Sequence, residues 1–293
     1  MKLSKDVLRA VDRMTLQRVF GMGYRAGRIA VTAISYLDPV PRGVRIRKGS
    51  AADRPSLLAV PDGADPMPSV VWMHGGAFCF NSPRAYATTV AHIAKAIGAS
   101  ILIPSYRRAP EHPYPAAHED MLAAFRSVSD GSRPVIVAGD SAGGNLARAV
   151  AIALREAGEP APAGMLLMSP WVDLTLSGES IHLNDGKDAI LRAKDLPQHT
   201  EAYAGHLDLA DPRVSPLNAD LAGLPPALIQ CGSDELFLSE GRELATRLEA
   251  AGSLAEIQVY EDMWHDFQAH AGMLEEAATA VERMGDWARP LVA

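Results

Sequence analysis

The residues Gly139-Asp140-Ser141-Ala142-Gly143 have the types and spacing of a nucleophile turn. They follow the apolar run Pro134 to Ala138, which has the length of a buried strand, and they precede the helix-like stretch Asn145 to Arg155. Glycines on both sides of Ser141 remove the Cβ atoms that would clash in a sharp turn, so the hydroxyl is presented above a sheet. The pattern predicts nucleophilic attack by Ser141, although a plain glycine-rich turn would have the same letters.

A serine hydroxyl is a weak nucleophile near neutral pH, so Ser141 needs a general base. His265 follows the strand-like run Glu256 to Tyr260 and a short loop, at the sheet edge where α/β proteins place their chemistry. His270 is expected instead to be a solvated residue at the start of the last helix. The position of His265 therefore makes it the predicted base.

A carboxylate must orient the base, and two adjacent candidates follow the strand-like run Pro226 to Gln230. Asp234 is the predicted acid, because its shorter side chain suits the turn, and Glu235 is the alternative. Three other carboxylates near the candidate site are expected to be cap, turn or surface groups: Asp140, Asp262 and Asp266.

Backbone donors for a developing oxyanion are predicted after another strand-like run, Ser69 to Met73. The segment His74-Gly75-Gly76-Ala77-Phe78 lets the backbone approach a ligand closely with its N–H groups exposed, although a glycine turn alone has the same form. Gly75 and Gly76 are the predicted donors, and Ala142, just after the nucleophile, completes the set.

Short apolar runs alternate with helix-like stretches along most of the chain, which predicts an α/β fold with a mostly parallel sheet covered on both faces. The expected strands lie near residues 44–47, 56–60, 69–73, 100–103, 134–138, 164–168, 226–230 and 256–260. The expected helices between them lie near residues 85–97, 115–128, 146–157, 239–251 and 272–287.

Two segments depart from this alternation, and they are expected to form a cap over the site. Apolar residues recur at helical spacing from Val7 to Phe20, so residues 1–43 are predicted to be N-terminal cap helices. Residues 172–224 are long and polar, which is typical of an inserted lid. Residues 44–171 and 225–293 are then the two parts of the core.

The composition excludes several classes of function. The 293 residues carry a net charge of −7 and no large Lys/Arg block, which argues against nucleic-acid binding. There is no apolar secretory signal and no run long enough to span a membrane, so a cytoplasmic location is expected. Cys79 and Cys231 are not spaced as a disulfide framework or as a metal site, and no metal is expected.

Together these segments resemble the hormone-sensitive-lipase-like branch of the α/β-hydrolases, also called bacterial family IV esterases. The resemblance rests on four motifs, two of them discussed above: His74-Gly75-Gly76, Tyr106-Arg107 with Ala109 to Ala117, Gly139 to Asn145, and Asp211 to Leu217. It extends through Asp234 and His265-Asp266-Phe267 and covers the chain from about residue 44 to its end.

The resemblance implies an eight-stranded α/β-hydrolase core with a helical cap, and a serine carboxylesterase that acts on a small ester without a cofactor. Ser141, Asp234 and His265 match the family's triad, while Gly75, Gly76 and Ala142 match its oxyanion donors. The alternatives are a lactonase or amidase with the same triad, and a ligand-binding protein such as the gibberellin receptors, which lack the histidine. Relatives often pair through the last strand, so Glu256 to Tyr260 is the candidate for a homodimer contact.

Three departures from the family pattern stand out: Ala77 replaces a glycine, Arg108 replaces a leucine, and Glu235 to Leu238 replaces the commoner sequence after the acid. Ala77 keeps its N–H, so the oxyanion donors are expected to survive, and its methyl is expected to narrow the acyl side of the pocket. Three aromatic residues are candidates for the pocket lining, with core packing as the alternative: Phe78, Tyr203 and Trp264.

Overall fold

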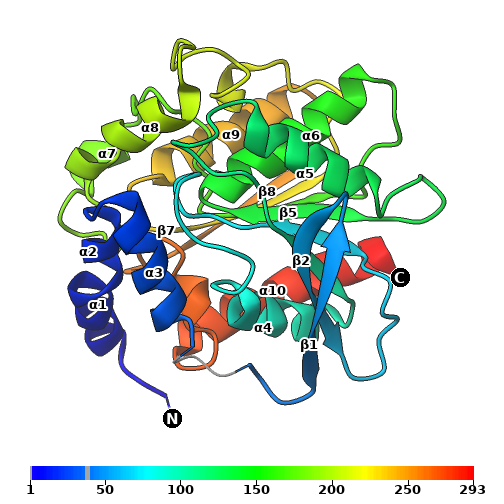
Figure 1. The fold of residues 1–293 in the computed structure, drawn as a ribbon, viewed down its shortest axis with the longest axis horizontal. Helices are drawn as coiled ribbons and strands as arrows, with labels where there is room; N and C mark the ends of the chain where they lie inside the picture. Colours follow the sequence, from blue (N-terminus) through cyan, green and yellow to red (C-terminus); the bar gives the residue numbers. More distant parts are fainter. Residues whose placement is uncertain (1, 37–39) are drawn as a thin grey trace.

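A computed structural model describes residues 2–36 and 40–293, and its core is a sheet of eight strands (Figure 1). The remaining residues, 1 and 37–39, fall within the predicted N-terminal cap segment and lie outside the described part. The strands are β1 (Val44–Ala51), β2 (Arg54–Pro61), β3 (Val70–Met73), β4 (Ile101–Pro104), β5 (Ile136–Asp140), β6 (Met165–Met168), β7 (Ala227–Gly232) and β8 (Ala255–Tyr260).

The strand order is β1-β2-β4-β3-β5-β6-β7-β8, and the chain from β3 onward pairs in parallel. Within the described residues, the pairs β1–β2 and β2–β4 are antiparallel and the other pairs are parallel. Strands β3 to β7 are buried along their length, which fits their continuous apolar sequences. The predicted eight-stranded, mostly parallel α/β-hydrolase sheet is confirmed.

Helices cover both faces of this sheet (Figure 1). One face packs against α4 (Ala87–Ile97) and α10 (Glu275–Val292), and its apolar core includes Trp72 and Ile93. The other face packs against α5 (Ala116–Arg126), α6 (Ala142–Glu156) and α9 (Leu238–Ala250). Parallel strands therefore end together at one edge of a buried sheet, and the candidate site residues follow these ends.

The N-terminal helices lie beside the insertion at this edge of the molecule (Figure 1). They are α1 (Lys5–Met14), α2 (Leu16–Phe20) and α3 (Tyr24–Ile34), and the insertion holds α7 (Ser180–Leu183), η1 (Ala193–Asp195), α8 (Pro197–Ala204) and η2 (Pro216–Asn218). Tyr24 donates from its hydroxyl to the Gln198 carbonyl at 3.1 Å, and His199 Nε2 lies 3.3 Å from the Phe20 carbonyl oxygen. The two segments predicted to form a cap thus contact each other directly.

The boundaries around the nucleophile differ from the sequence-based expectation. The strand β5 ends at Asp140 instead of Ala138, because Gly139 and Asp140 still pair with β3 or β6. The helix α6 starts at Ala142, directly after Ser141. The turn between strand and helix therefore consists of the serine alone.

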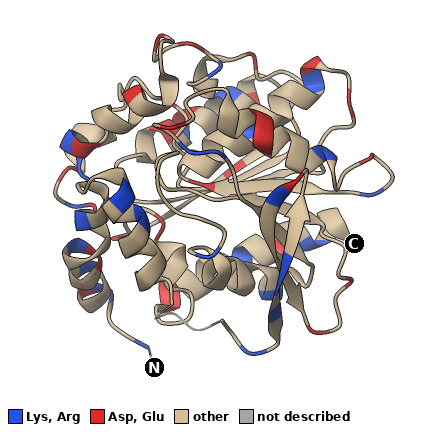
Figure 2. Ribbon diagram, in the orientation of Figure 1, with Lys and Arg blue, Asp and Glu red and all other residues tan. Residues whose placement is uncertain are grey.

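Of the helices in the described ranges, none is both long and apolar enough to cross a membrane. Figure 2 shows Lys and Arg segments distributed among Asp and Glu segments over helices, strands and loops.

Candidate active site

Ser141 occupies a backbone conformation that side chains rarely adopt, with φ at 50° and ψ at −122°. Strain of this kind costs on the order of 1–3 kcal/mol and persists only where the surroundings impose it. The surroundings here are β5 on one side and the first turn of α6 on the other. Ser141 N–H donates to the Met168 carbonyl of β6 at 2.9 Å, which fixes the turn to the sheet.

Glycine is required on both sides of this serine because other backbone passes too close for a Cβ atom. A Cβ built on Gly143 would lie 1.8 Å from the Met73 carbonyl oxygen at the end of β3. A Cβ on Gly139 would lie 2.4 Å from the Gly143 carbonyl oxygen. The two glycines therefore allow α6 to start directly against the strand ends, with its free N–H groups next to Ser141.

Asp140 is fully buried and is not the turn or surface carboxylate that the sequence suggested. It accepts from Trp72 Nε1 at 2.9 Å and from the Gly75 N–H at 3.0 Å. Burial raises the pKa of Asp140 to about 7. This carboxyl connects the nucleophile strand to the glycine loop that follows β3.

The N–H groups without a protein acceptor next to Ser141 differ at one position from the predicted oxyanion donors. The Gly75 N–H already donates to Asp140, so it is not free for a ligand. Over the described residues, no protein acceptor is recorded for the N–H groups of Gly76, Ala77 and Ala142. Gly76 has φ at 108° and Ala77 has φ at 51°, a turn that presents consecutive N–H groups. Gly76, Ala77 and Ala142 are therefore the free donors around Ser141.

His265 lies in a buried loop after β8, and its side chain is 2% exposed. Its ring packs edge-on against Phe237, with ring centroids 5.2 Å apart. Nε2 lies 3.3 Å from Asp266 Oδ2, while Nδ1 is buried without a hydrogen-bond partner. Burial lowers the pKa of His265 to about 3, so the imidazole is neutral and can accept a proton. No hydrogen bond between His265 and Ser141 is recorded in this part of the structure.

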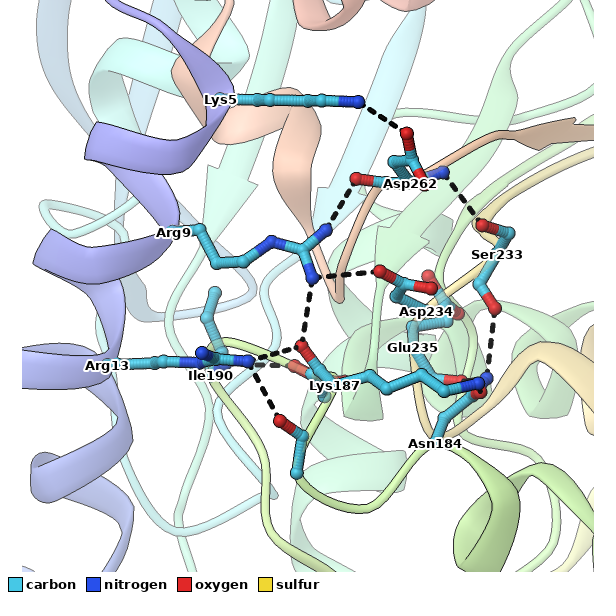
Figure 3. A network of polar contacts seen from close by, with 12 residues as sticks. Lys5, Arg9, Arg13, Asn184, Lys187, Ile190, Ser233, Asp234, Glu235 and Asp262 are labelled. Carbon is cyan, nitrogen blue, oxygen red and sulfur yellow. Dashed lines mark hydrogen bonds and ion pairs between the residues drawn. The ribbon is translucent and has the colours of Figure 1, made fainter.

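The structure does not place Asp234 on the predicted base. Its carboxylate accepts from Arg9 at 2.8 Å, and its side chain is 19% exposed (Figure 3). No hydrogen bond joins Asp234 to His265 among the described contacts. The adjacent Glu235, the alternative acid, is instead fully buried.

Glu235 belongs to the same buried cluster as the base. Its Oε2 accepts from Ser169 Oγ at 2.7 Å and from the Gly232 N–H at 2.8 Å. Ser169 Oγ in turn accepts from the Asp266 N–H at 3.2 Å, directly after His265. Glu235 Oε1 is buried without a partner, and burial raises the pKa of Glu235 to about 8. The cluster therefore holds an unpaired carboxyl oxygen and an unpaired imidazole nitrogen.

Two other residues lie in places that the sequence did not predict. Asp266 is buried next to Asp140, and burial raises its pKa well above the usual range, so it is not a surface group. His270 is not solvated, because its Nε2 lies 2.7 Å from Asp12 Oδ2 and its side chain is 12% exposed. Asp262, in contrast, is an exposed carboxylate that pairs with Lys5.

Ser141 lines a small, partly enclosed pocket. Its lining includes Ala77, Trp171 and Phe237 from the core, Phe20 from α2, and Leu191 and Leu196 from the insertion. Sequence reasoning missed most of these residues, because insertion and helix residues far apart in the chain carry no motif that places them together.

The three aromatic residues suggested for the pocket lie in packed positions instead. Phe78 and Tyr203 stack on each other with ring centroids 3.6 Å apart, and both are almost fully buried. Trp264 is also buried, and its Nε1 donates to Asp12 at 2.8 Å. All three side chains are therefore packed in the core, which is the alternative to a pocket-lining position.

Arg108, which departs from the family pattern, is half-buried beside the glycine loop. Its guanidinium donates to the Asn81 carbonyl at 2.6 Å, so it supports the segment after Ala77. Arg28 of α3 adds a second tie, donating to the Cys79 and Ala109 carbonyls at 2.7 Å each. Across the described residues, no group of three or more His, Cys, Asp or Glu could hold a metal ion.

Comparisons with known proteins identify relatives over most of the chain. Residues 70–269 match a family model described as the alpha/beta hydrolase fold. LipR of Mycobacterium tuberculosis is 33% identical over 292 residues, which cover 97% of this chain and 94% of LipR. An acetyl-hydrolase of Streptomyces hygroscopicus is 37% identical over 75% of each chain. The crystal structure of an esterase from the bacterial hormone-sensitive lipase family has a TM-score of 0.93, with 32% identity over 99% of this chain and 100% of that one.

Proposed function

The chain belongs to the hormone-sensitive-lipase-like family of α/β-hydrolases, and we propose that Ser141, His265 and Glu235 perform its chemistry. The protein is a carboxylesterase. The observation that carries the assignment of the nucleophile is the strained Ser141 turn, which lines the pocket and directly precedes α6.

The proposed reaction proceeds through an acyl-enzyme. Ser141 Oγ bonds to the ester carbonyl carbon while its proton passes to His265, and the carbonyl oxygen becomes an oxyanion facing Gly76, Ala77 and Ala142. His265 then gives this proton to the leaving alcohol oxygen as the ester bond breaks. A water molecule attacks the acyl-enzyme with His265 again as base, which releases the carboxylic acid and restores Ser141.

The proposed acid is Glu235 and not Asp234. A triad acid must accept from the base nitrogen that faces away from the serine, and it must be shielded from water to orient the ring. Glu235 is buried beside the His265 loop with Oε1 free, and His265 Nδ1 is also free. Asp234 fits less well, because its carboxylate is partly exposed and already pairs with Arg9.

The substrate class that the pocket favours is an ester with a short acyl chain. The space above Ser141 is small, and Ala77 adds a methyl group to its wall. A relative that is 37% identical is named an acetyl-hydrolase, which agrees with a small acyl group.

Hydrolysis of p-nitrophenyl esters from acetate to octanoate tests this function. Wild type should cleave acetate and butyrate best, and Ser141→Ala should lose at least about 10⁴-fold in kcat. Ser132→Ala, in an exposed loop, is the matched control and should retain activity. Equal, slow turnover by wild type and Ser141→Ala would exclude the serine mechanism. Lactone and anilide substrates in the same assay separate an esterase from a lactonase or amidase.

We further propose that residues 1–43 and 172–224 form the cap, since both segments contribute to the pocket lining. The strand β8 lies at an edge of the sheet, where its free backbone groups could pair with a second copy. A homodimer through Glu256 to Tyr260 is accordingly proposed, and sedimentation of Ile257→Pro against wild type tests it. The cytoplasmic location is retained as a proposal that cell fractionation can check.

A further inference from the structure

The helix α1 buries one apolar and one acidic side chain, since Leu8 and Asp12 are each 2% exposed. Val7, Val11 and Met14 are 48%, 45% and 65% exposed, whereas Asp12 is 2% exposed. The polar residues of α1 that contact other segments lie at positions 5, 9, 12 and 13, which share one side of a helix. Both signs of charge alternate along α1 (Figure 2). Leu8 packs in the hydrophobic core, and the polar contacts of α1 add ties to the loops of the site.

Arg9 joins three segments of the site with one guanidinium (Figure 3). It donates to Asp234 Oδ2 at 2.8 Å, to the Asp262 carbonyl at 2.6 Å and to the Lys187 carbonyl at 3.2 Å. These acceptors belong to the loop of Glu235, the loop of His265 and the insertion. The planar, five-donor guanidinium suits such a junction, which a lysine ammonium cannot reproduce.

The Glu235 loop is held from the insertion as well. Asn184 Nδ2 donates to the Ser233 carbonyl at 3.0 Å and to the Glu235 carbonyl at 2.9 Å (Figure 3). Ser233 Oγ accepts from the Asp262 N–H at 2.8 Å, which links the loop to the loop of His265. Through Arg9, α1 thus binds the side chain of Asp234, the residue directly before the proposed acid Glu235.

Asp12 contacts the His265 loop both before and after the histidine. Its Oδ2 accepts from Trp264 Nε1 at 2.8 Å, and His270 Nε2 lies 2.7 Å away. The Arg9 guanidinium also lies over the Trp264 ring, 5.2 Å from its centroid. The imidazole of His265 has no partner at Nδ1, so its orientation depends on how firmly the neighbouring residues are held.

We propose that α1 positions the acid and the base of the esterase site, with Arg9 and Asp12 as its positioning residues. Arg9 holds the residue before Glu235, and Asp12 holds the residue before His265. Neither residue touches the substrate or the reacting atoms. The inference rests on the proposed roles of Glu235 and His265, and it assigns to α1 a function separate from lining the pocket.

The decisive comparison is Asp12→Ala with Asp6→Ala, an exposed aspartate on the same helix. Displacement of His265 by a fraction of an ångström should lower kcat of Asp12→Ala by about 10- to 100-fold, because rate is steeply sensitive to such misplacement. KM should change by no more than about 3-fold, since the pocket lining is intact. The rate at which a phosphonate inactivates Ser141 should fall in parallel with kcat, and Asp6→Ala should match wild type in all three.

Hydrogen exchange of the segment 261–270 gives a readout that does not need activity. Asp12→Ala should exchange faster there than Asp6→Ala, while the segment 136–145 around Ser141 stays unchanged. If Asp12→Ala does not fold, Asp12→Asn keeps the shape and one acceptor oxygen, and it should show a smaller effect in the same direction. Unchanged kcat and unchanged exchange in a folded Asp12 variant would overturn the proposal.

Rescue by conservative variants separates positioning from general stability. His270→Gln can still donate to Asp12, so it should retain more activity than His270→Ala at equal thermal stability. Arg9→Lys should behave like Arg9→Ala, because one ammonium cannot bridge three acceptors in a fork. Loss of activity that follows thermal stability alone would contradict the inference. Absence of any Ser141-dependent activity in wild type would instead contradict the proposed function, and the exchange result would still decide the role of α1.

Discussion

The nucleophile and the other two members of the proposed triad are held in different ways. Ser141 is fixed by backbone: the register of β5 between β3 and β6, the start of α6, and two glycines that admit close contacts. Glu235 and His265 lie on loops whose neighbours are tied by side chains to α1, more than 220 residues away in sequence. The position of the nucleophile is therefore determined by the backbone of the sheet. The loops of the proposed acid and base are held by side-chain contacts from a helix outside the sheet.

The difference teaches where each part can fail. A change in the nucleophile turn should damage folding and activity together, because the same backbone contacts serve both. A change in the ties to α1 should affect mainly activity, because the sheet does not depend on them. The predictions below test this contrast, from the largest expected effect to the smallest.

Gly143→Ala should break the nucleophile turn. The added methyl would lie 1.8 Å from the Met73 carbonyl oxygen, so α6 or β3 must move. We expect either insoluble protein or a loss of more than about 10³-fold in kcat, since the oxyanion donors and Ser141 move together. Gly23→Ala, with open space around the added methyl group and a φ of −60°, is the control. A fully active Gly143→Ala would refute the steric account of this turn.

Glu235→Gln and Asp234→Asn distinguish the proposed catalytic acid, Glu235, from the partner of Arg9, Asp234. Above pH 8, where the wild-type carboxyl is charged, loss of this charge should lower kcat by about 10²- to 10⁴-fold in Glu235→Gln. Asp234→Asn loses only the charge that faces Arg9, so its kcat should fall by no more than about 10-fold. Steady-state kinetics on p-nitrophenyl acetate give the ratio directly. A larger loss in Asp234→Asn would restore Asp234 as the acid.

Glu235→Gln should also change the pH dependence of stability. The pKa of Glu235 is about 8 in the fold and 4.5 without its surroundings, so the unfolded chain releases this proton first as pH rises. The stability that the neutral carboxyl contributes is complete below pH 4.5 and is lost as pH rises through 8. The melting temperature of Glu235→Gln should exceed that of wild type by about 3 °C at pH 9 and converge with it at pH 5. A constant difference in melting temperature between the two proteins from pH 5 to pH 9 would contradict the raised pKa of the buried Glu235 carboxyl.

Ala77→Gly should have the smallest effect, because it keeps the N–H and removes only a methyl group from the pocket wall. The ratio of kcat/KM for hexanoate to that for acetate should rise by about 2- to 10-fold, as expected for one methyl group of added space. Stability should change little, since relief of the positive φ at Ala77 offsets the greater freedom of glycine in the unfolded chain. An unchanged ratio would show that another wall limits the acyl chain.

The fold could be predicted from the sequence because short apolar runs and helical stretches alternate, and each signal is local. Ser141 carries such a local signal too, in its two glycines and the strand before it. The choice between Asp234 and Glu235 does not, because a turn of one residue more or less decides which adjacent carboxylate faces inward. In the structure Glu235 is buried and Asp234 pairs with Arg9, a contact between distant segments that the sequence does not mark.

The donor loop shows the same limit. The glycines of His74-Gly75-Gly76 indicated free N–H groups, but which group is free depends on the buried carboxyl of Asp140. Aromatic residues near the motifs suggested a pocket lining, yet Phe78 and Tyr203 satisfy each other in a stack. Local pattern therefore identified the loops, and contacts between distant segments assigned the individual atoms.

The long sequence separation of the α1 contacts also has a consequence for synthesis of the chain. Residues 5–14 are synthesised more than 220 residues before their partners at 234, 262, 264 and 270. The charged face of α1 can remain hydrated during this interval, whereas an apolar face of the same size would expose a surface prone to aggregation. The contacts of α1 with the two loops can therefore form only after translation has produced both loops.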